Sequence, residues 1–282
     1  MTRKCLMAAA AGVVLATVCA TSAGAITVYG NSASFGNNPI HIIDGATGVE
    51  SQRFIGQPSG NGRGVVTIGN TLYYTVVDDA NIYKMDRTTG AAMGSILTTN
   101  ASMSTLAWDG SHFWTADYAG TNRAFRIDPT TGLNVKTINL EGAQNYMDGL
   151  EWFNGKLIGN RCDACGTYDI WDLDGNRLVE GFISTANNVG TGIAYDGANF
   201  LVSNIYSSSI GVYDFNTGGL LNTINLTGSG SFLIEDLSVD YAARPDTGGG
   251  VVPEPTTWSM MILGFGALGV LARRRRHAAM PA

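Results

Sequence analysis

Four carboxylate side chains stand at or near the start of short apolar segments that recur along the chain, and these residues are the best suited to chemistry. If the segments lie side by side, the carboxylates converge at one mouth of the fold. They would then hold Ca²⁺, which prefers several oxygen ligands, or act as the acid and base of a glycosidase. Ordinary solvated rim charges are the third interpretation, and all three stay open. The four residues are Asp148, Glu151, Glu235 and Asp236.

The second candidate is a pair of cysteines, Cys162 and Cys165, in a segment that we expect to be a hairpin loop. In an oxidising compartment such a pair usually forms a structural disulfide, and we predict one here. A redox-active pair would need a helix N-terminus or basic neighbours to lower the pKa of one thiol. A zinc site would need two further ligands. The redox and metal roles remain alternatives.

A nucleophilic hydrolase is not expected, because the chain has few bases to activate a nucleophile. His41 falls in a predicted strand, His112 at the start of another, and His277 near the C-terminus. The sequence contains neither a Gly-x-Ser-x-Gly elbow nor a phosphate-binding loop. We therefore expect a protein that is not an enzyme and needs no cofactor, with Ca²⁺ at the carboxylates as the open exception. The alternative is a hydrolase or lyase that acts on polysaccharide through those carboxylates.

The elements that would position these residues repeat along the chain. The turn Asp-x-x-Thr-Gly occurs four times, and a shortened copy, Asp-x-x-Gly, occurs once. Successive aspartates are 42, 42, 44 and 42 residues apart, which is the period of a four-stranded propeller blade. Asp caps such a turn with its own side chain, and Gly accepts the left-handed backbone that the turn requires. The aspartates are Asp44, Asp86, Asp128, Asp172 and Asp214.

One unit of this repeat is split between the two ends of the chain. Residues 26–54 supply three outer strands with no inner strand before them, whereas residues 236–240 supply an inner strand with no outer strands after it. The two fragments complete one blade beside four whole units. We therefore predict an all-β, five-bladed β-propeller over residues 26–242, closed by pairing of its N- and C-terminal strands. Recurring aromatic residues such as Trp114 and Trp171 are expected to pack between blades.

The repeated unit resembles the blades of bacterial propeller families with Asp-x-x-Thr-Gly turns, such as the pyrroloquinoline-quinone type. The likeness covers most of residues 26–241. It implies the fold alone, because quinone-dependent dehydrogenases have more such units and no calcium and quinone site carries over to this sequence.

The first 25 residues have the features of a signal peptide. A basic start with Arg3 and Lys4 precedes an apolar stretch, and Ala23-Gly24-Ala25 forms a small-residue cleavage site. Signal peptidase would remove residues 1–25, so we expect the protein to be exported.

Residues 26–250 carry a strongly negative charge. Removing Arg3, Lys4 and four C-terminal arginines from the 17 basic residues leaves 11, and removing Glu254 from the 23 acidic residues leaves 22, which gives a net charge of −11. Nucleic acid binding requires Lys and Arg to displace counterions from the phosphates. We therefore exclude nucleic acid as a partner.

The C-terminal segment combines three features in a fixed order. After a flexible linker at 243–252 come a Pro-Glu-Pro triplet, an uncharged stretch expected to be a short transmembrane helix at about 257–272, and four arginines. The uncharged run is about fifteen residues, or roughly 22 Å as a helix. A stable membrane span needs ~20 residues, so this helix is short. The arginines would stay on the cytoplasmic side.

This segment, at residues 253–276, resembles the PEP-CTERM sorting signal. The resemblance implies recognition by an exosortase-type membrane peptidase, cleavage near the Pro-Glu-Pro triplet and transient contact with the inner membrane. It also implies a Gram-negative bacterium that makes extracellular polysaccharide. The residues that carry it are Pro253, Glu254, Pro255, Trp258, Gly264, Gly266, Arg273, Arg274, Arg275 and Arg276.

These features predict an exported protein that is processed at its C-terminus and acts in the periplasm, on the outer surface or outside the cell. We expect a binding or structural module of the envelope or extracellular matrix, with polysaccharide as its candidate ligand.

Overall fold

The computed structural model describes residues 26–33, 37–228 and 232–241. The predicted signal peptide, the linker at 243–252 and the sorting segment at 253–276 lie outside these residues. Among the residues described, no helix is long and apolar enough to cross a membrane.

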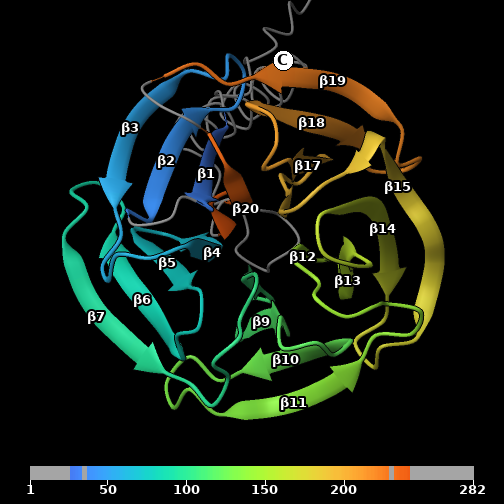
Figure 1. The fold of residues 1–282 in the computed structure, drawn as a ribbon, viewed down its shortest axis with the longest axis horizontal. Coiled ribbons are helices and arrows are strands. Elements are labelled where there is room, and N and C mark those ends of the chain that lie inside the picture. Colours follow the sequence, from blue (N-terminus) through green and yellow to red (C-terminus); the bar gives the residue numbers. More distant parts are fainter. Residues whose placement is uncertain (1–25, 34–36, 229–231, 242–282) are drawn as a thin grey trace, which may run out of the picture.

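Five four-stranded sheets surround a central axis, as Figure 1 shows. Each sheet is a blade, with its first strand near the axis and its fourth strand at the rim. Blade 1 contains strands from both ends of the described chain, whereas blades 2 to 5 each follow the sequence order. From axis to rim, the strands are β20 (Ile234–Ser238), β1 (Thr27–Ser32), β2 (Pro39–Asp44) and β3 (Glu50–Ile55) in blade 1; β4 (Gly62–Ile68), β5 (Thr71–Val76), β6 (Asn81–Asp86) and β7 (Ala92–Leu97) in blade 2; β8 (Ala107–Trp108), β9 (Phe113–Ala116), β10 (Arg123–Ile127) and β11 (Asn134–Asn139) in blade 3; β12 (Leu150–Phe153), β13 (Lys156–Asn160), β14 (Cys165–Trp171) and β15 (Arg177–Val189) in blade 4; and β16 (Ile193–Tyr195), β17 (Asn199–Ser203), β18 (Ser209–Asp214) and β19 (Leu220–Asn225) in blade 5.

Blade 1 closes the ring by pairing the last strand with the first. β20 lies antiparallel to β1, with Tyr29 opposite Ser238 and Asn31 opposite Asp236. β1 then pairs with β2, and β2 with β3. The predicted five-bladed propeller, closed by its N- and C-terminal strands, is therefore confirmed.

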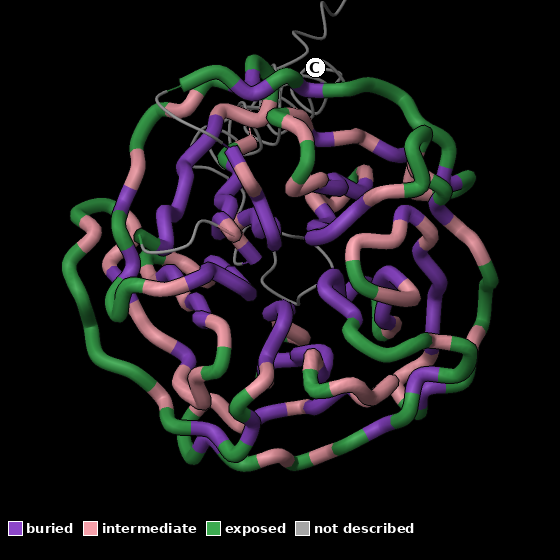
Figure 2. The backbone as a smooth tube through the Cα atoms, viewed as in Figure 1, coloured by how far each residue is buried: buried purple, intermediate pink, exposed green. Residues whose placement is uncertain are grey.

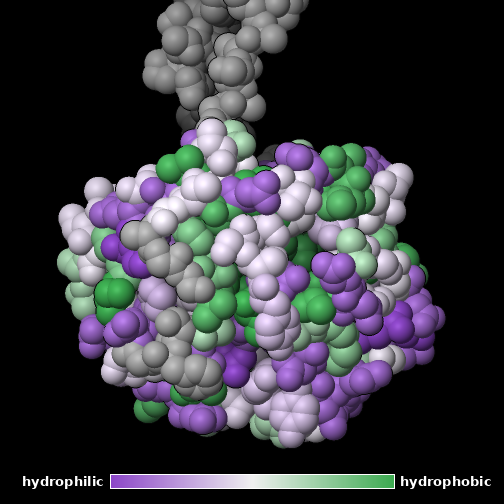
Figure 3. Space-filling model, turned by 45° about the horizontal axis from the view of Figure 1, so that its top comes forward, coloured by the Kyte–Doolittle hydropathy of each residue, from purple (hydrophilic) through white to green (hydrophobic). Residues whose placement is uncertain are grey.

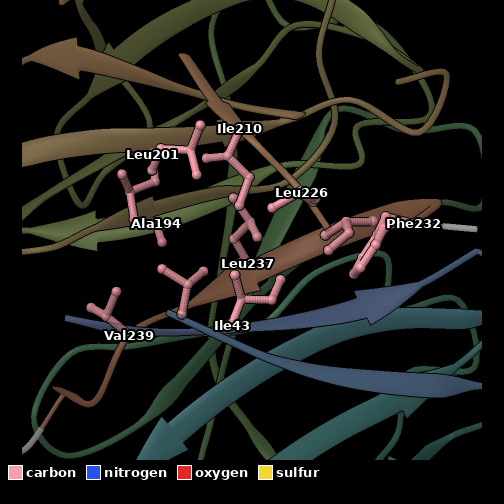
Figure 4. Packing of buried hydrophobic residues seen from close by; sticks show 11 residues of the cluster. Ile43, Ala194, Leu201, Ile210, Leu226, Phe232, Leu237 and Val239 are labelled. Atoms are coloured by element: carbon pink, nitrogen blue, oxygen red, sulfur yellow. The ribbon is translucent and has the colours of Figure 1, made fainter. Parts of the chain in front are cut away.

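The hydrophobic core is divided into five clusters, and each lies between two neighbouring blades. Figure 4 shows the cluster between blades 5 and 1, to which Ile43 of β2 and Leu201 of β17 both belong. Figure 2 shows that buried residues concentrate near the axis and exposed residues at the rim. The recurring aromatic residues take part in this packing as predicted, because Trp114 and Trp171 are fully buried between blades 3 and 4.

The repeated turns connect neighbouring blades as well as the strands within a blade. Asp214 Oδ1 accepts hydrogen bonds from the Asn216 and Thr217 amides at 3.0 and 2.8 Å, and the same pattern recurs in blades 1, 2 and 3. Gly218 has a φ of +67°, and a Cβ atom there would lie 1.8 Å from the Phe182 carbonyl oxygen of blade 4. Glycine is therefore needed for the left-handed backbone and for the close approach of the preceding blade.

Candidate functional site

At the centre of the ring, Asp236 holds several inner strands together. Its Oδ2 atom accepts hydrogen bonds from the Val65 and Leu106 amides and from the Thr105 hydroxyl, each at 3.0 Å. The Thr105 hydroxyl also lies 3.2 Å from the Leu150 carbonyl oxygen of β12. The Asp236 carboxylate thus connects blade 1 to blades 2 and 3, and the Thr105 hydroxyl continues the contact to blade 4. Burial raises the pKa of Asp236 well above its usual value, although its hydrogen bonds act to lower it.

Glu235 forms a buried ion pair with Arg63 of β4. The Arg63 guanidinium contacts the Glu235 carboxylate and lies over the Tyr118 ring, 4.2 Å from its centroid. Burial raises the pKa of Glu235, and the positive charge of Arg63 opposes this effect. Burial also raises the pKa of Tyr118 to about 12, and its hydroxyl interacts with Asp163. These contacts link β20 and β4 with loops of blades 3 and 4.

Asp148 lies close enough to Glu235 for their charges to interact. Its carboxylate contacts the Asn160 side chain and accepts a hydrogen bond from the Ala164 amide at 2.8 Å. Burial raises the pKa of Asp148 well above its usual value, and the negative charge of Glu235 raises it further. Two neighbouring carboxyl groups with raised pKa values resemble an acid and base pair, but both are already bound by other groups of the protein.

The interpretation of the four carboxylates as solvated rim charges is wrong. At most 2% of each residue is exposed, because the inner strands pack closely around the axis. The structure brings Asp148 and Glu235 together, whereas Glu151 contacts the Tyr241 hydroxyl and Asp236 contacts the backbone of other blades. Within the described ranges, no group of three or more His, Cys, Asp or Glu side chains is arranged to hold a metal ion. Binding of Ca²⁺ by these residues stays a hypothesis.

Cys162 and Cys165 form the predicted disulfide in the loop between β13 and β14. This loop also carries the Ala164 amide that donates to Asp148. Cys165 begins β14, where it lies opposite Val189 at the end of β15. The disulfide loop therefore contacts two features of blade 4: the buried Asp148 and the end of the outer strand β15.

The end of β15 contains a bulge that was not predicted from the sequence. β14 advances by two residues between the pairs Thr167–Ser184 and Cys165–Val189, whereas β15 advances by five. The extra residues lie between Ser184 and Val189. They form one wall of a cavity of about 220 Å³, and strands β17, β18 and β19 of blade 5 form the other wall.

The number of residues between a turn and the next inner strand does not reveal this bulge. In blade 4, Gly175 of the turn precedes Gly192 of the next inner strand by 17 residues, and in blade 3 Gly132 precedes Gly149 by the same 17 residues. The same number of residues therefore forms the bulge in blade 4 and an ordinary connection after blade 3.

Comparisons with known proteins add one family and a set of similar folds. Residues 251–276 match the PEP-CTERM protein-sorting motif. No match is found among curated proteins. A chain of a nidogen/laminin complex is 12% identical, with 77% of this chain and 98% of that chain covered and a TM-score of 0.53. This similarity agrees with the propeller fold and carries no information about a ligand.

Two further solved structures are similar over a shorter part of the chain. Kuenenia stuttgartiensis hydrazine synthase is 14% identical, with 58% of this chain and 48% of that chain covered and a TM-score of 0.42. Myxococcus xanthus glutaminyl cyclase is 15% identical, with 58% of this chain and 70% of that chain covered and a TM-score of 0.49.

The sorting motif marks proteins that are exported and sorted to the cell envelope or the extracellular surface, and it implies processing by exosortase, a membrane protein. The chain therefore carries the signal of an exported exosortase substrate, attached to a five-bladed propeller.

Proposed function

We propose that this exported propeller is a non-enzymatic binding module of the cell envelope or extracellular matrix, with polysaccharide as its ligand. The observation that carries the proposal is the environment of the four predicted site carboxylates. Each is buried and contacts other groups of the protein, and three of them, Glu151, Glu235 and Asp236, contact residues outside their own blade, which supports a structural role for these residues. A ring fixed in this way is a rigid support for a binding surface.

Two further features support a neutral polysaccharide as the ligand class. The net charge of −11 over residues 26–250, counted above, disfavours polyanions. On the face shown in Figure 3, hydrophobic residues are scattered among hydrophilic ones. A large apolar docking surface for another protein would instead be a continuous patch.

The test is a binding and hydrolysis screen of the exported protein after purification. We expect binding to a subset of neutral glycans on an array, with no release of reducing ends or unsaturated products from the same polysaccharides. Absence of binding to any glycan would overturn the polysaccharide assignment. Release of products would overturn the non-enzymatic assignment and favour the second candidate.

The second candidate is an envelope hydrolase or lyase that uses Asp148 and Glu235. The observation that favours it is the raised pKa of both carboxyl groups, which burial causes and which their mutual repulsion increases at Asp148. If products are released, Glu235→Gln should abolish the release, because it keeps an acceptor for Arg63 but cannot exchange a proton.

A further inference from the structure

The cavity between the β15 bulge and blade 5 has the composition of a binding site for a neutral hydroxyl-rich ligand. Its lining residues include no charged side chain. They supply amides and hydroxyls, which both donate and accept hydrogen bonds, as a sugar hydroxyl does. The polar residues that line the cavity include Thr185, Asn187, Asn204, Ser209, Tyr213 and Thr223.

Tyr213 provides a largely buried polar group in the wall of the cavity. The residue is only 5% exposed, and burial raises the pKa of its hydroxyl. Burial is the one cause of this shift, with no contribution from a hydrogen bond, whereas a tyrosine hydroxyl in a protein interior usually has a hydrogen-bond partner. A ligand hydroxyl or solvent in the cavity would supply that partner.

The Tyr213 ring lies against Gly211, whose missing side chain makes room for it. A Cβ atom on Gly211 would be 2.6 Å from Tyr213 Cε2 and 3.0 Å from its hydroxyl oxygen. The ring is thus seated on the backbone of β18, next to the cavity that Gly211 also lines. Tyr213 therefore combines an apolar ring with a hydroxyl at one wall of the cavity, the mixture of apolar and polar groups that is typical of small-molecule sites.

The cavity runs from this buried tyrosine to exposed residues at its mouth. Asn187 of the bulge and Thr223 of β19 are both exposed, and both line the cavity. The volume of about 220 Å³ is larger than that of an engineered cavity of ~150 Å³ that binds benzene, a six-membered ring. This is room for one sugar ring, with the remainder of a glycan outside.

The wall formed by the bulge is held in place by local contacts. The Thr185 hydroxyl donates to the Val189 carbonyl oxygen at 2.8 Å, and the Gly190 amide donates to the Ala164 carbonyl oxygen of the disulfide loop at 3.2 Å. Cys165 lies opposite Val189 in the same sheet. The end of the bulge is therefore attached to the disulfide loop, and a wall ordered in advance favours binding because less ordering is needed.

We propose that this cavity binds one neutral sugar residue of a polysaccharide chain, with the Tyr213 hydroxyl and the Asn187 amide as hydrogen-bonding groups. The inference rests on the proposed function and assigns its binding site.

The test compares variants of the exported protein on a neutral glycan array and by titration with the array ligand that binds best. Tyr213→Phe removes only the hydroxyl and should weaken binding about tenfold. Asn187→Ala changes an exposed residue of the mouth and should weaken binding severalfold. Tyr206→Phe is the matched control, because Tyr206 is 73% exposed and is not among the lining residues of the cavity.

The possible outcomes separate the site from the function. Glycan binding by the wild type that is weakened in both cavity variants and unchanged in Tyr206→Phe supports the site. Equal binding by all variants overturns the site and leaves the proposed function intact. Absence of glycan binding by the wild type overturns both, and a preference for acidic glycans overturns the neutral ligand class. Thermal melting of each variant shows that it is folded, and Asn187→Ala keeps the test decisive if Tyr213→Phe does not fold.

Discussion

At Asp236, burial and hydrogen bonding act on the pKa in opposite directions. Burial favours the neutral carboxylic acid, whereas donors to Oδ2 favour the carboxylate. The pKa is raised, so burial outweighs the hydrogen bonds. Asp236 therefore keeps its proton to a higher pH in the folded protein than in the unfolded chain.

We predict that Asp236→Asn makes the protein more stable than the wild type near neutral pH. Asn keeps an acceptor for the three donors and cannot ionise. In the wild type, the unfolded chain loses the proton near the usual pKa of 3.8 while the folded protein retains it. Wild-type stability should then fall as pH rises, by about 1.4 kcal/mol per pH unit up to the raised pKa, after which the loss stops growing.

Urea unfolding at several pH values between about 4 and 7 measures this difference. Asp236→Ala is the control, because it removes the acceptor and should be less stable throughout. The prediction fails if the wild type gains stability over Asp236→Asn as pH rises.

The positions of these carboxylates could be predicted from the repeat, but their surroundings could not. The spacing placed Asp236 at the start of an inner strand. Its hydrogen bonds come from the Val65 and Leu106 amides of two other blades. These amides lie close to Asp236 only when the ring has formed.

At the level of the structural elements, the turns do more than reverse the chain. The turn glycines of blades 1, 3, 4 and 5 each lie so close to the preceding blade that a Cβ atom would come within 2.2 Å of a carbonyl oxygen of its outer strand. Each turn glycine thus packs directly against the preceding blade, and a larger residue at that position would push the two blades apart. These glycines are Gly48, Gly132, Gly175 and Gly218.

We predict that Gly218→Ala destabilises the protein by more than Gly155→Ala does. Both glycines have positive φ, +67° and +72°, so both substitutions cost about 1–2 kcal/mol of backbone strain. Only at Gly218 would the new Cβ atom collide with the Phe182 carbonyl oxygen, because nothing lies within 4 Å at Gly155. We expect a total loss of about 3 kcal/mol or more at Gly218. Equal losses in the free energy of unfolding would contradict the proposed contact between blades.

Strand positions followed from the repeat more closely than strand lengths did. The inner strand of blade 3 is only Ala107–Trp108, because the preceding Leu106 amide donates its hydrogen bond to Asp236 instead of to β9. Turn chemistry is local and can be predicted from a few residues. The extent of a strand and the presence of a bulge depend on partners far away in the sequence.

At the level of the whole molecule, ring closure depends on one strand. A chain that ends at residue 233 lacks β20, and with it the Glu235–Arg63 ion pair and the Asp236 hydrogen bonds. We predict that this truncation loses about 5 kcal/mol or more, a large part of the stability of a typical domain. It should therefore lose its cooperative thermal transition.

The matched control ends at residue 241 and keeps every contact described above. Its melting should be cooperative and close to that of the longer chain. A cooperative transition at the same temperature in both truncations would show that the ring does not need β20.

The C-terminal motif gives a prediction about processing. Mature protein from the producing organism should lack residues 258–276, because the motif at 251–276 directs cleavage by exosortase. Replacing Pro253 and Pro255 with Ala should leave an uncleaved, membrane-associated form, whereas Pro281→Ala, outside the motif, should be processed normally. Mass spectrometry of the C-terminal peptide distinguishes these forms. A wild-type protein that retains its arginines in the inner membrane fraction would show that the segment is a permanent anchor.

The split blade also determines when folding can finish. Tyr29 must pair with Ser238, more than two hundred residues later in the chain, and contacts between such distant residues form slowly because a long loop must first be closed. Blades 2 to 5 are each continuous in sequence and are able to form as the chain emerges, while β1 waits with one edge unpaired. The sorting motif begins at residue 251, shortly after β20 ends at Ser238. We therefore expect β20 and the Pro-Glu-Pro triplet to reach the far side of the membrane in quick succession, and the propeller cannot close its ring until almost all of its chain has crossed.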